Sequence, residues 1–388
     1  MRKIATLFIF IGIAFMLVSC NAARGGNQGL DNGTHNGGDN NNPVPLAFTR
    51  GAWVATVYGI DFPQTPTTNS NLLKQQIDGI VQNAAEKGID ALFFQARPCA
   101  DAFYKSAHFP WSKYLTGTQG VAPSNNFDPL SYIIEECHAN GIQLHAWINP
   151  YRITALATDT LVSNHVANIV PWITMRVGGK LYFNPGEPVA RGLIVEGVRE
   201  IIQNYDVDGI HFDDYFYPEG ITDEDAFTFA GRWSGPDNLA DWRRWNVNQL
   251  IRQTRQVIRE TASHVAFGIS PAGIWANKTS NPLGSDTKGY ESYYAIYADS
   301  RGWVKNAWID YIVPQIYWYV GQQGSDFTTV LNWWCEVCKG TDVALYVGLA
   351  AYRVNDGTFA RGGDEITAQL ALADELADGV VAFSLKDL

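Results

Sequence analysis

The sequence is poor in basic residues, in cysteine and in the short motifs that mark several common protein classes. Its 388 residues contain five Cys, and 28 Lys and Arg stand against 39 Asp and Glu, which gives a formal net charge of −11. This balance argues against nucleic acid as a partner, because a phosphate backbone binds basic surfaces. The sequence has no dinucleotide or Walker glycine pattern, no His-x-His or His-Glu-x-x-His spacing and no Gly-x-Ser-x-Gly elbow. We therefore predict no cofactor and no metal site.

The longest apolar run near the start is too short to span a bilayer. Arg2 and Lys3 precede an apolar stretch over residues 4–18, and Leu17-Val-Ser-Cys20 closes it. A spanning helix needs about 20 apolar residues, whereas this arrangement is typical of a lipoprotein signal peptide. We predict a signal peptide over residues 1–19 and lipidation of Cys20; ordinary export with an incidental cysteine is the alternative. The predicted localisation is export, with acyl chains anchoring the protein to the periplasmic or cell-surface side of a bacterial cell membrane.

Residues 20–46 are rich in Asn and Gly and show no apolar periodicity. This composition is typical of a flexible tether.

The four later cysteines are Cys99, Cys137, Cys335 and Cys338. The Cys335-x-x-Cys338 spacing could indicate a metal or redox site. We expect buried structural thiols or one local disulfide instead, since no second Cys/His pair with zinc spacing accompanies it.

Eight β-rich runs recur along residues 47–388, with helical patterns between them. The runs cover 50–57, 91–97, 143–150, 209–215, 264–271, 311–318, 345–352 and 380–385, and the helical patterns include 71–87, 129–140, 187–204, 241–261 and 364–376. Alternation of this kind predicts a parallel sheet. The count of eight favours an α/β fold of the (β/α)8 or TIM-barrel type over an open sheet. No helical pattern follows the eighth run, so the final helix is predicted to be missing.

Polar residues gather where these runs end, which is where TIM barrels carry their chemistry. Gln95, His145, His211, Ser270 and Gln315 are examples. The alternative is a structural hydrogen-bond network inside the barrel, and His145 is the member that fits this alternative best. Aromatic residues are frequent in the adjacent loops, and they suit the flat faces of sugar rings.

Asp213 and Asp214 are the strongest chemical signal. Adjacent carboxyls repel each other, so the pKa of one should rise, which suits a general acid. Glycoside hydrolysis commonly needs such an acid plus a second carboxylate or the acetamido group of the substrate. The candidates for a second acid, which the sequence does not rank, are Asp101, Glu187, Glu219 and Glu291. A non-catalytic glycan-binding barrel and a metal-dependent hydrolase using His145, His211 and Asp213 are the alternatives.

Six motifs in order resemble the glycosyl-hydrolase-like family 10. They are residues 50–54 (Arg-Gly-Ala-Trp-Val), 95–104 (Gln-Ala-Arg-Pro-Cys-Ala-Asp-Ala-Phe-Tyr), 110–112 (Pro-Trp-Ser), 145–152 (His-Ala-Trp-Ile-Asn-Pro-Tyr-Arg), 208–215 (Asp-Gly-Ile-His-Phe-Asp-Asp-Tyr) and 314–318 (Pro-Gln-Ile-Tyr-Trp). The resemblance implies a TIM-barrel glycosidase, often a bacterial lipoprotein, that acts on peptidoglycan glycan strands, especially strands without stem peptides.

The resemblance also implies that Asp213 and Asp214 lie in the active cleft, where we assign them the catalytic role. It implies a lining of Arg97, Asn149, Tyr151, Arg152, Gln315 and Tyr317, and we add Asp101, His211, Tyr215 and Trp318 as substrate-binding candidates. The fourth run further resembles a distant Asp-x-Asp-x-Glu signature of chitinase-type barrels. His211, Asp213 and Tyr215 take its three places, so Asp213 would steady an acetamido group and the acid stays unassigned.

Replacement of Cys20 tests the predicted anchor. Cys20→Ser removes the thiol that would carry the lipid, so the protein should move from the membrane fraction to the soluble fraction. Fractionation followed by immunoblotting measures this. A variant that stays with the membranes as wild type does would contradict lipid anchoring.

Overall fold

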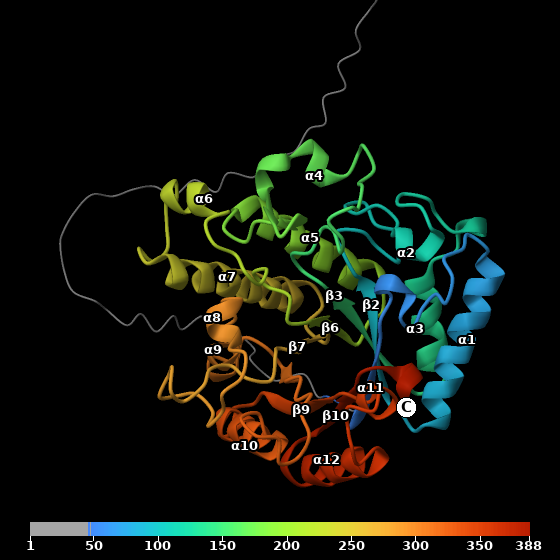
Figure 1. The fold of residues 1–388 in the computed structure, drawn as a ribbon. Coiled ribbons are helices and arrows are strands. Elements are labelled where there is room, and N and C mark those ends of the chain that lie inside the picture. The colour runs from blue at the N-terminus through green and yellow to red at the C-terminus, as the bar shows by residue number, and fades with distance from the viewer. Residues whose placement is uncertain (1–45, 47) are drawn as a thin grey trace, which may run out of the picture. The chain divides into compact units, whose positions relative to one another are not determined.

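Eight parallel strands close into a barrel (Figure 1). The computed structural model describes residues 46 and 48–388, so the predicted signal peptide, Cys20 and nearly all of the tether lie outside the described residues. In barrel order the strands are β1 (Arg50–Val54), β10 (Gly379–Ala382), β9 (Ala344–Leu349), β8 (Tyr311–Ile312), β7 (Ala266–Ile269), β6 (Gly209–Phe212), β3 (Gln143–Ile148) and β2 (Ala91–Arg97). The predicted TIM barrel is therefore confirmed.

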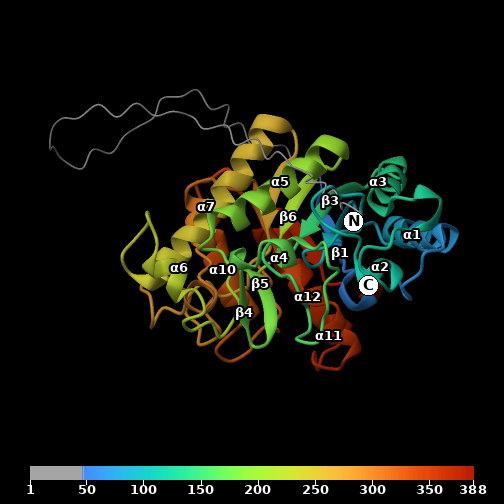
Figure 2. The same cartoon turned by 90° about the horizontal axis from the view of Figure 1, so that it is seen from above.

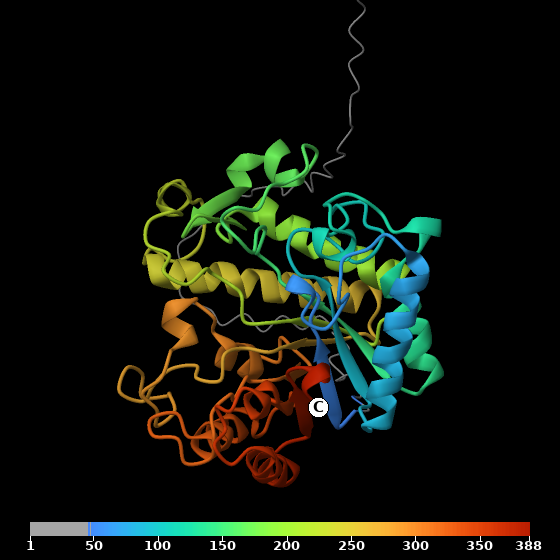
Figure 3. The same cartoon turned by 45° about the vertical axis from the view of Figure 1, so that its right-hand side comes forward.

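Helices cover the outside of the barrel, as Figure 2 shows from above. The longer ones are α1 (Ser70–Glu86), α3 (Pro129–Ala139), α5 (Pro188–Asn204), α7 (Leu239–Thr261), α10 (Phe327–Cys338) and α12 (Gly363–Leu376). The shorter ones are α2 (Lys113–Thr116), α4 (Val166–Ile169), α6 (Ala226–Ala230), α8 (Ser292–Ala295), α9 (Ser300–Lys305) and α11 (Tyr352–Asn355). Figure 3 shows α5 and α7 running side by side.

Side chains of Asn or Asp fix where several helices begin. Asn69 accepts hydrogen bonds from two backbone N–H groups at the start of α1, and Asp128 and Asn238 do the same for α3 and α7. These contacts satisfy donors that a helix start otherwise leaves free. The five helical patterns predicted from the sequence begin and end within two residues of the observed helices.

A small antiparallel hairpin was not predicted. It consists of β4 (Thr174–Val177) and β5 (Lys180–Phe183), joined by Gly178 and Gly179 with φ of 56° and 79°. Positive φ at both turn residues suits a tight hairpin. The hairpin lies against the segment that follows β3, through a bridge between Arg152 and Tyr182.

The end of the barrel opposite the carboxyl ends of the strands is closed by aromatic rings. Phe48 lies just before β1, stacks on Tyr346 with ring centroids 4.1 Å apart, and contacts Phe93 and His145 edge-on. Above this layer His145 Nδ1 and His211 Nδ1 lie 2.8 and 3.2 Å from the Tyr311 hydroxyl. Burial lowers the pKa of both histidines, to about 4 for His145, so neutral rings fill the lumen.

Two glycines make room for these rings. A Cβ on Gly209 would lie 2.2 Å from the imidazole of His145, and a Cβ on Gly268 would lie 2.1 Å from the ring of Tyr311. Any other residue at these inward-facing positions of β6 and β7 would displace the rings. His145 therefore belongs to the packed interior, as the structural alternative predicted.

The seam between the first and last strands is closed. Arg50 pairs with Val380 and Ala52 with Ala382 in parallel register. A 3-10 turn (Leu385–Asp387) follows β10. Among residues 46 and 48–388, no helix has the length and apolarity needed to cross a bilayer.

The four described cysteines are free thiols. Cys99 and Cys137 are buried, while Cys335 and Cys338, for which buried thiols or a local disulfide were expected, are half-buried on α10. The alternative of one local disulfide is wrong for the described part of the chain. The Cys335 thiol donates instead to the carbonyl of Leu376 at the end of α12, over 3.3 Å.

Truncation of Phe48 tests the aromatic closure of the barrel. Phe48 is 2% exposed, so Phe48→Ala should lower the free energy of unfolding by about 3–5 kcal/mol, the usual cost of removing a buried phenyl ring. Phe227→Ala is a matched control, because that ring is 94% exposed and its loss should change stability by less than about 0.5 kcal/mol. Urea denaturation measures both. Equal losses would contradict a closing role for Phe48.

Candidate active site

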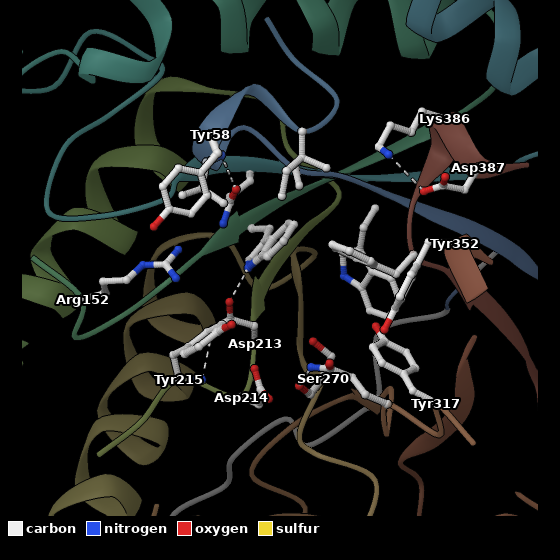
Figure 4. A pocket seen from close by; sticks show the side chains of 18 residues that line it. Tyr58, Arg152, Asp213, Asp214, Tyr215, Ser270, Tyr317, Tyr352, Lys386 and Asp387 are labelled. Carbon is white, nitrogen blue, oxygen red and sulfur yellow. Dashed lines mark hydrogen bonds and ion pairs between the residues drawn. The ribbon is translucent and has the colours of Figure 1, made fainter. Parts of the chain in front are cut away.

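A cavity of about 520 Å³ opens at the carboxyl ends of the strands (Figure 4). Every strand of the barrel contributes to its wall, either directly or through the residues that follow it. The lining consists of Trp53, Ala55, Val57, Tyr58, Ile60, Gln95, Trp147, Arg152, Asp213, Asp214, Tyr215, Ser270, Gln315, Tyr317, Tyr352, Phe383, Lys386 and Asp387. We call this space the main cavity.

Asp213 is held by three hydrogen-bond donors. The indole Nε1–H of Trp147 donates to Asp213 Oδ2 over 3.0 Å, and the Nδ2–H of Asn149 donates to the same oxygen. The backbone N–H of Tyr215 donates to Oδ1 over 3.3 Å. Since donors of this kind favour the ionised carboxylate, the surroundings of Asp213 are arranged for a negative charge.

The direction of these hydrogen bonds is fixed by the backbone. The N–H groups of Thr56 and Val57 donate to Gln95 Oε1 over 2.8 and 2.9 Å, so the other end of that amide must be its NH2 group. Gln95 Nε2 then donates to Asn149 Oδ1 over 2.6 Å, which turns the NH2 group of Asn149 toward Asp213. A backbone N–H cannot act as an acceptor, so neither amide can reverse.

Asp213 and Asp214 together hold a proton more tightly than isolated carboxyls do. Burial raises the pKa of Asp213, and the neighbouring charge of Asp214 raises it further. Burial also raises the pKa of Asp214, while Gln315 and Arg152 act in the opposite direction. Because the donors around Asp213 favour its ionised form, we place the shared proton on Asp214.

Aromatic and cationic side chains surround the two carboxyls. Figure 4 shows Arg152 and Tyr215 on the side of the aspartates, and Tyr317 and Tyr352 across the cavity. The guanidinium of Arg152 lies 4.9 Å from the centre of the Tyr215 ring and donates from Nε and Nη2 to the carbonyl of Pro98. Rings beside carboxyls and amides suit a sugar, which offers flat C–H faces and hydroxyl groups.

Six of the twelve residues predicted for the site line the main cavity, and six do not. The lining six are Asp213, Asp214, Arg152, Tyr215, Gln315 and Tyr317. The other six are Arg97, Asp101, Asn149, Tyr151, His211 and Trp318. The structure places these six residues outside the lining of the main cavity.

Two of these six act from beneath the cavity. Asn149 is fully buried and reaches the site through Asp213. His211 is also buried, and its Nε2 accepts a hydrogen bond from Trp53 Nε1 and lies 2.9 Å from the hydroxyl of Ser270. The position of a residue near the end of a strand does not show whether other side chains cover it inside the barrel.

The other four pack around the barrel. The guanidinium of Arg97 lies over the ring of Phe109, and Asp101 accepts a hydrogen bond from Gln119. Tyr151 is fully buried in the main hydrophobic core, and Trp318 is half-buried against the same core.

None of the proposed second acids, Asp101, Glu187, Glu219 and Glu291, lines the main cavity. Asp387, from the turn after β10, does line it, opposite the two aspartates (Figure 4). Sequence reasoning also missed Trp53, Trp147, Tyr352 and Phe383. Polar residues were sought at the ends of five predicted strands. The same search at the ends of all eight strands would have found Tyr352 and Phe383.

The metal alternative requires His145, His211 and Asp213 to meet. Within the described residues no group of three or more His, Cys, Asp or Glu side chains is placed to hold a metal ion. The two histidines face Tyr311, while Asp213 faces Trp147 and Asn149.

A closed parallel barrel whose carboxyl-end cavity joins paired carboxyls with aromatic rings is the architecture of a TIM-barrel glycoside hydrolase. The chain belongs to the glycosyl hydrolase-like 10 family, whose model matches residues 49–361. It is 42% identical over 351 residues to the glycosyl hydrolase YngK of Bacillus subtilis, covering 87% of this chain and 68% of that protein. It is 35% identical over 363 residues to the glycosyl hydrolase DigH of Escherichia coli K12, covering 86% and 82%.

Solved structures share the fold at low identity. The glycoside hydrolase domain of PgaB (BpsB) from Bordetella bronchiseptica has a TM-score of 0.56 at 13% identity, covering 87% of this chain and 94% of that domain. The catalytic domain of a β-amylase from Paenibacillus polymyxa has a TM-score of 0.55 at 10% identity, covering 88% and 93%. The family and these neighbours together support a glycosidase function.

The hydrogen-bond donors around Asp213 predict how kcat/KM depends on pH. Asn149→Ala removes one donor, which leaves the ionised carboxylate less stabilised and raises the pKa of Asp213. More of Asp213 is then protonated at a given acidic pH, so the acid limb of kcat/KM against pH should move to higher pH. Glycan cleavage measured across pH tests this. Asn277→Ala is the control: it removes another buried asparagine, which does not line the main cavity, and should leave the acid limb in place. If Asn149→Ala folds and its acid limb does not move, Asn149 does not stabilise the ionised form of Asp213.

Proposed function

We propose that this protein is an exported, lipid-anchored glycosidase that cleaves glycosidic bonds in N-acetylated cell-envelope glycan, most specifically in the glycan strands of peptidoglycan. The observation that carries the proposal is the pair Asp213 and Asp214 in the main cavity, where the side chains of Trp147 and Asn149 both donate to Asp213. The resemblance of six ordered motifs and the predicted lipoprotein signal support the choice of an envelope glycan.

Asp214 acts as the general acid in this proposal. Its proton passes to the glycosidic oxygen as the bond from that oxygen to the anomeric carbon breaks, so the leaving sugar departs as a neutral alcohol. Water then adds its oxygen to the anomeric carbon, and its proton returns to Asp214. The sum of these steps is hydrolysis, with the acid regenerated.

Asp213 stabilises the positive charge that develops at the anomeric centre. It stays ionised because Trp147 and Asn149 donate to it, and it is oriented before substrate arrives. It does so either directly or by orienting the acetamido group of the substrate, whose oxygen can attack the anomeric carbon. Tyr215 remains a neutral phenol that can donate a hydrogen bond, since the charge of Asp214 and burial raise its pKa to about 12.

The position of the described chain start agrees with anchoring upstream. Leu46 and Phe48 lie at the amino ends of β8 and β9, beside Ala344 and Tyr346, whereas the main cavity lies at the carboxyl ends of the strands. An anchor that precedes residue 46 would therefore be joined to the face opposite the cavity. Such an attachment leaves the mouth of the cavity accessible to a polysaccharide.

Substitution of the two aspartates tests the catalytic assignment. Asp213→Asn and Asp214→Asn should each lower turnover by about 10²–10⁴-fold, the usual contribution of a positioned acid–base group. Glycan binding should change less, because the lost interaction is used mainly in the transition state. Both variants should fold, since each relieves repulsion between buried carboxyls. The double substitution of Cys335 and Cys338 by Ser is a control that should leave turnover unchanged.

Mass spectrometry of products from purified glycan strands, with and without stem peptides, provides the measurement. New reducing ends that depend on both aspartates support a glycosidase. Binding without products would instead indicate a non-catalytic glycan-binding barrel. Near wild-type hydrolysis by both folded Asn variants would overturn the role of the pair.

A further inference from the structure

A second, smaller cavity of about 190 Å³ lies between the starts of α5 and α7 and the loop that joins α6 to α7. Its wall includes Arg191, Trp242, Trp245, Phe227 and Trp233, and none of its lining residues belongs to the main cavity. We call it the rim cavity. Glu187, one of the proposed second acids, lines this space and not the main one.

Two large rings at the rim cavity are almost fully exposed. Phe227 is 94% exposed and Trp233 is 85% exposed, although apolar side chains of this size are usually covered. Exposed apolar patches beside a hollow commonly mark a ligand-binding groove. Free ring faces of this kind can stack against the C–H faces of a sugar.

The wall behind these rings is built and rigid. Trp242 packs edge-on against Phe229 with centroids 5.3 Å apart. Gly235, with φ of 95°, lets the loop approach it closely, because a Cβ there would lie 2.9 Å from the Trp242 ring. The hollow is therefore formed by fixed contacts and not by a gap between loose side chains.

A buried donor in the wall lacks a partner. Arg191 is only 4% exposed, and its Nη1–H donates to the carbonyl of Pro185 over 2.7 Å and to Asn246 Oδ1 over 2.9 Å. Its Nε–H has no partner among the residues that the structure describes. Because Nε is enclosed, the two Nη1 hydrogen bonds fix the guanidinium in the wall of the rim cavity.

The charges of the side chains at the rim cavity balance. Arg191 and Glu187 both line it, and Arg232 forms an ion pair with Asp237 over 2.7 Å. A phosphate-bearing ligand would need an excess of positive charge, which this arrangement does not offer. A polysaccharide, whose sugar rings carry flat C–H faces, matches the exposed rings of Phe227 and Trp233.

One stretch of chain joins the two cavities. Residues 213–238 leave the tip of β6 with the two aspartates and end at the start of α7, after passing through Phe227 and Trp233. In a (β/α)8 barrel the starts of the helices and the ends of the strands lie on the same face. A long glycan strand seated in the main cavity can therefore extend over this face.

From these observations we infer that the rim cavity is a second glycan-binding site, which holds a distant segment of the strand whose cleavage site lies in the main cavity. This inference rests on the proposed function for its ligand class. It predicts that the rim cavity contributes to affinity for long strands and contributes nothing for fragments that fill only the main cavity.

The test uses the full chain carrying Asp214→Asn, so that strands bind without being cleaved. Dissociation constants are measured for purified glycan strands without stem peptides and for disaccharide-length fragments. Adding Phe227→Ala and Trp233→Ala should weaken binding of long strands about tenfold, the scale expected when an aromatic anchor is removed. Binding of short fragments should not change. Trp172→Ala, which removes a 57% exposed tryptophan outside both cavities, is the matched control.

With both aspartates intact, the same double variant should raise KM for long strands and leave kcat unchanged. The inference is overturned if the double variant binds long strands as tightly as its parent, or if short fragments lose affinity equally. In both cases products formed from glycan strands would still support the proposed function. If no glycan yields products, the proposed function fails, while strand binding that depends on Phe227 and Trp233 would still support the second site.

Discussion

The hydrogen bonds that converge on Asp213 determine the layout of the main cavity. They begin at two backbone N–H groups after β1, pass through the amides of Gln95 and Asn149, and end at a carboxylate on β6. Three neighbouring strands, β2, β3 and β6, must keep their register for this chain to close. An ionised group is thereby held in a nearly dry site, where electrostatic stabilisation is strongest.

The packed interior beneath the main cavity explains how the barrel tolerates the two neighbouring carboxyls. Rings of Phe48, Phe93, Tyr311 and Tyr346 fill the lower lumen, and the two histidines stay neutral between them. This packing supports the cavity floor without adding charge near the aspartates. Two buried neighbouring carboxyls destabilise a fold at a pH at which both would ionise, and such a cost is commonly retained where it serves chemistry.

The loop that follows β6 links chemistry to recognition. It starts with Asp213 and Asp214, which face the main cavity, and later presents Phe227 and Trp233 beside the rim cavity. A polysaccharide offers many equivalent sugar rings, so binding far from the cleaved bond can add affinity without new chemistry. The proposed glycosidase would then select long strands through a surface separate from its catalytic groups.

The sequence alone determined the barrel, since eight β-rich runs alternating with helical patterns leave few other arrangements for a chain of this size. It also placed Asp213 and Asp214 at a strand end, because the end of a β-rich run is a local feature of the sequence. Tertiary structure alone decided which inward residues meet the cavity: Asn149 and His211 lie beneath it, and Tyr352 and Asp387 reach it from distant segments. How deep a side chain lies inside a barrel depends on the stagger between the strands and on which rings pack over that side chain. Both arise from contacts between residues far apart in sequence.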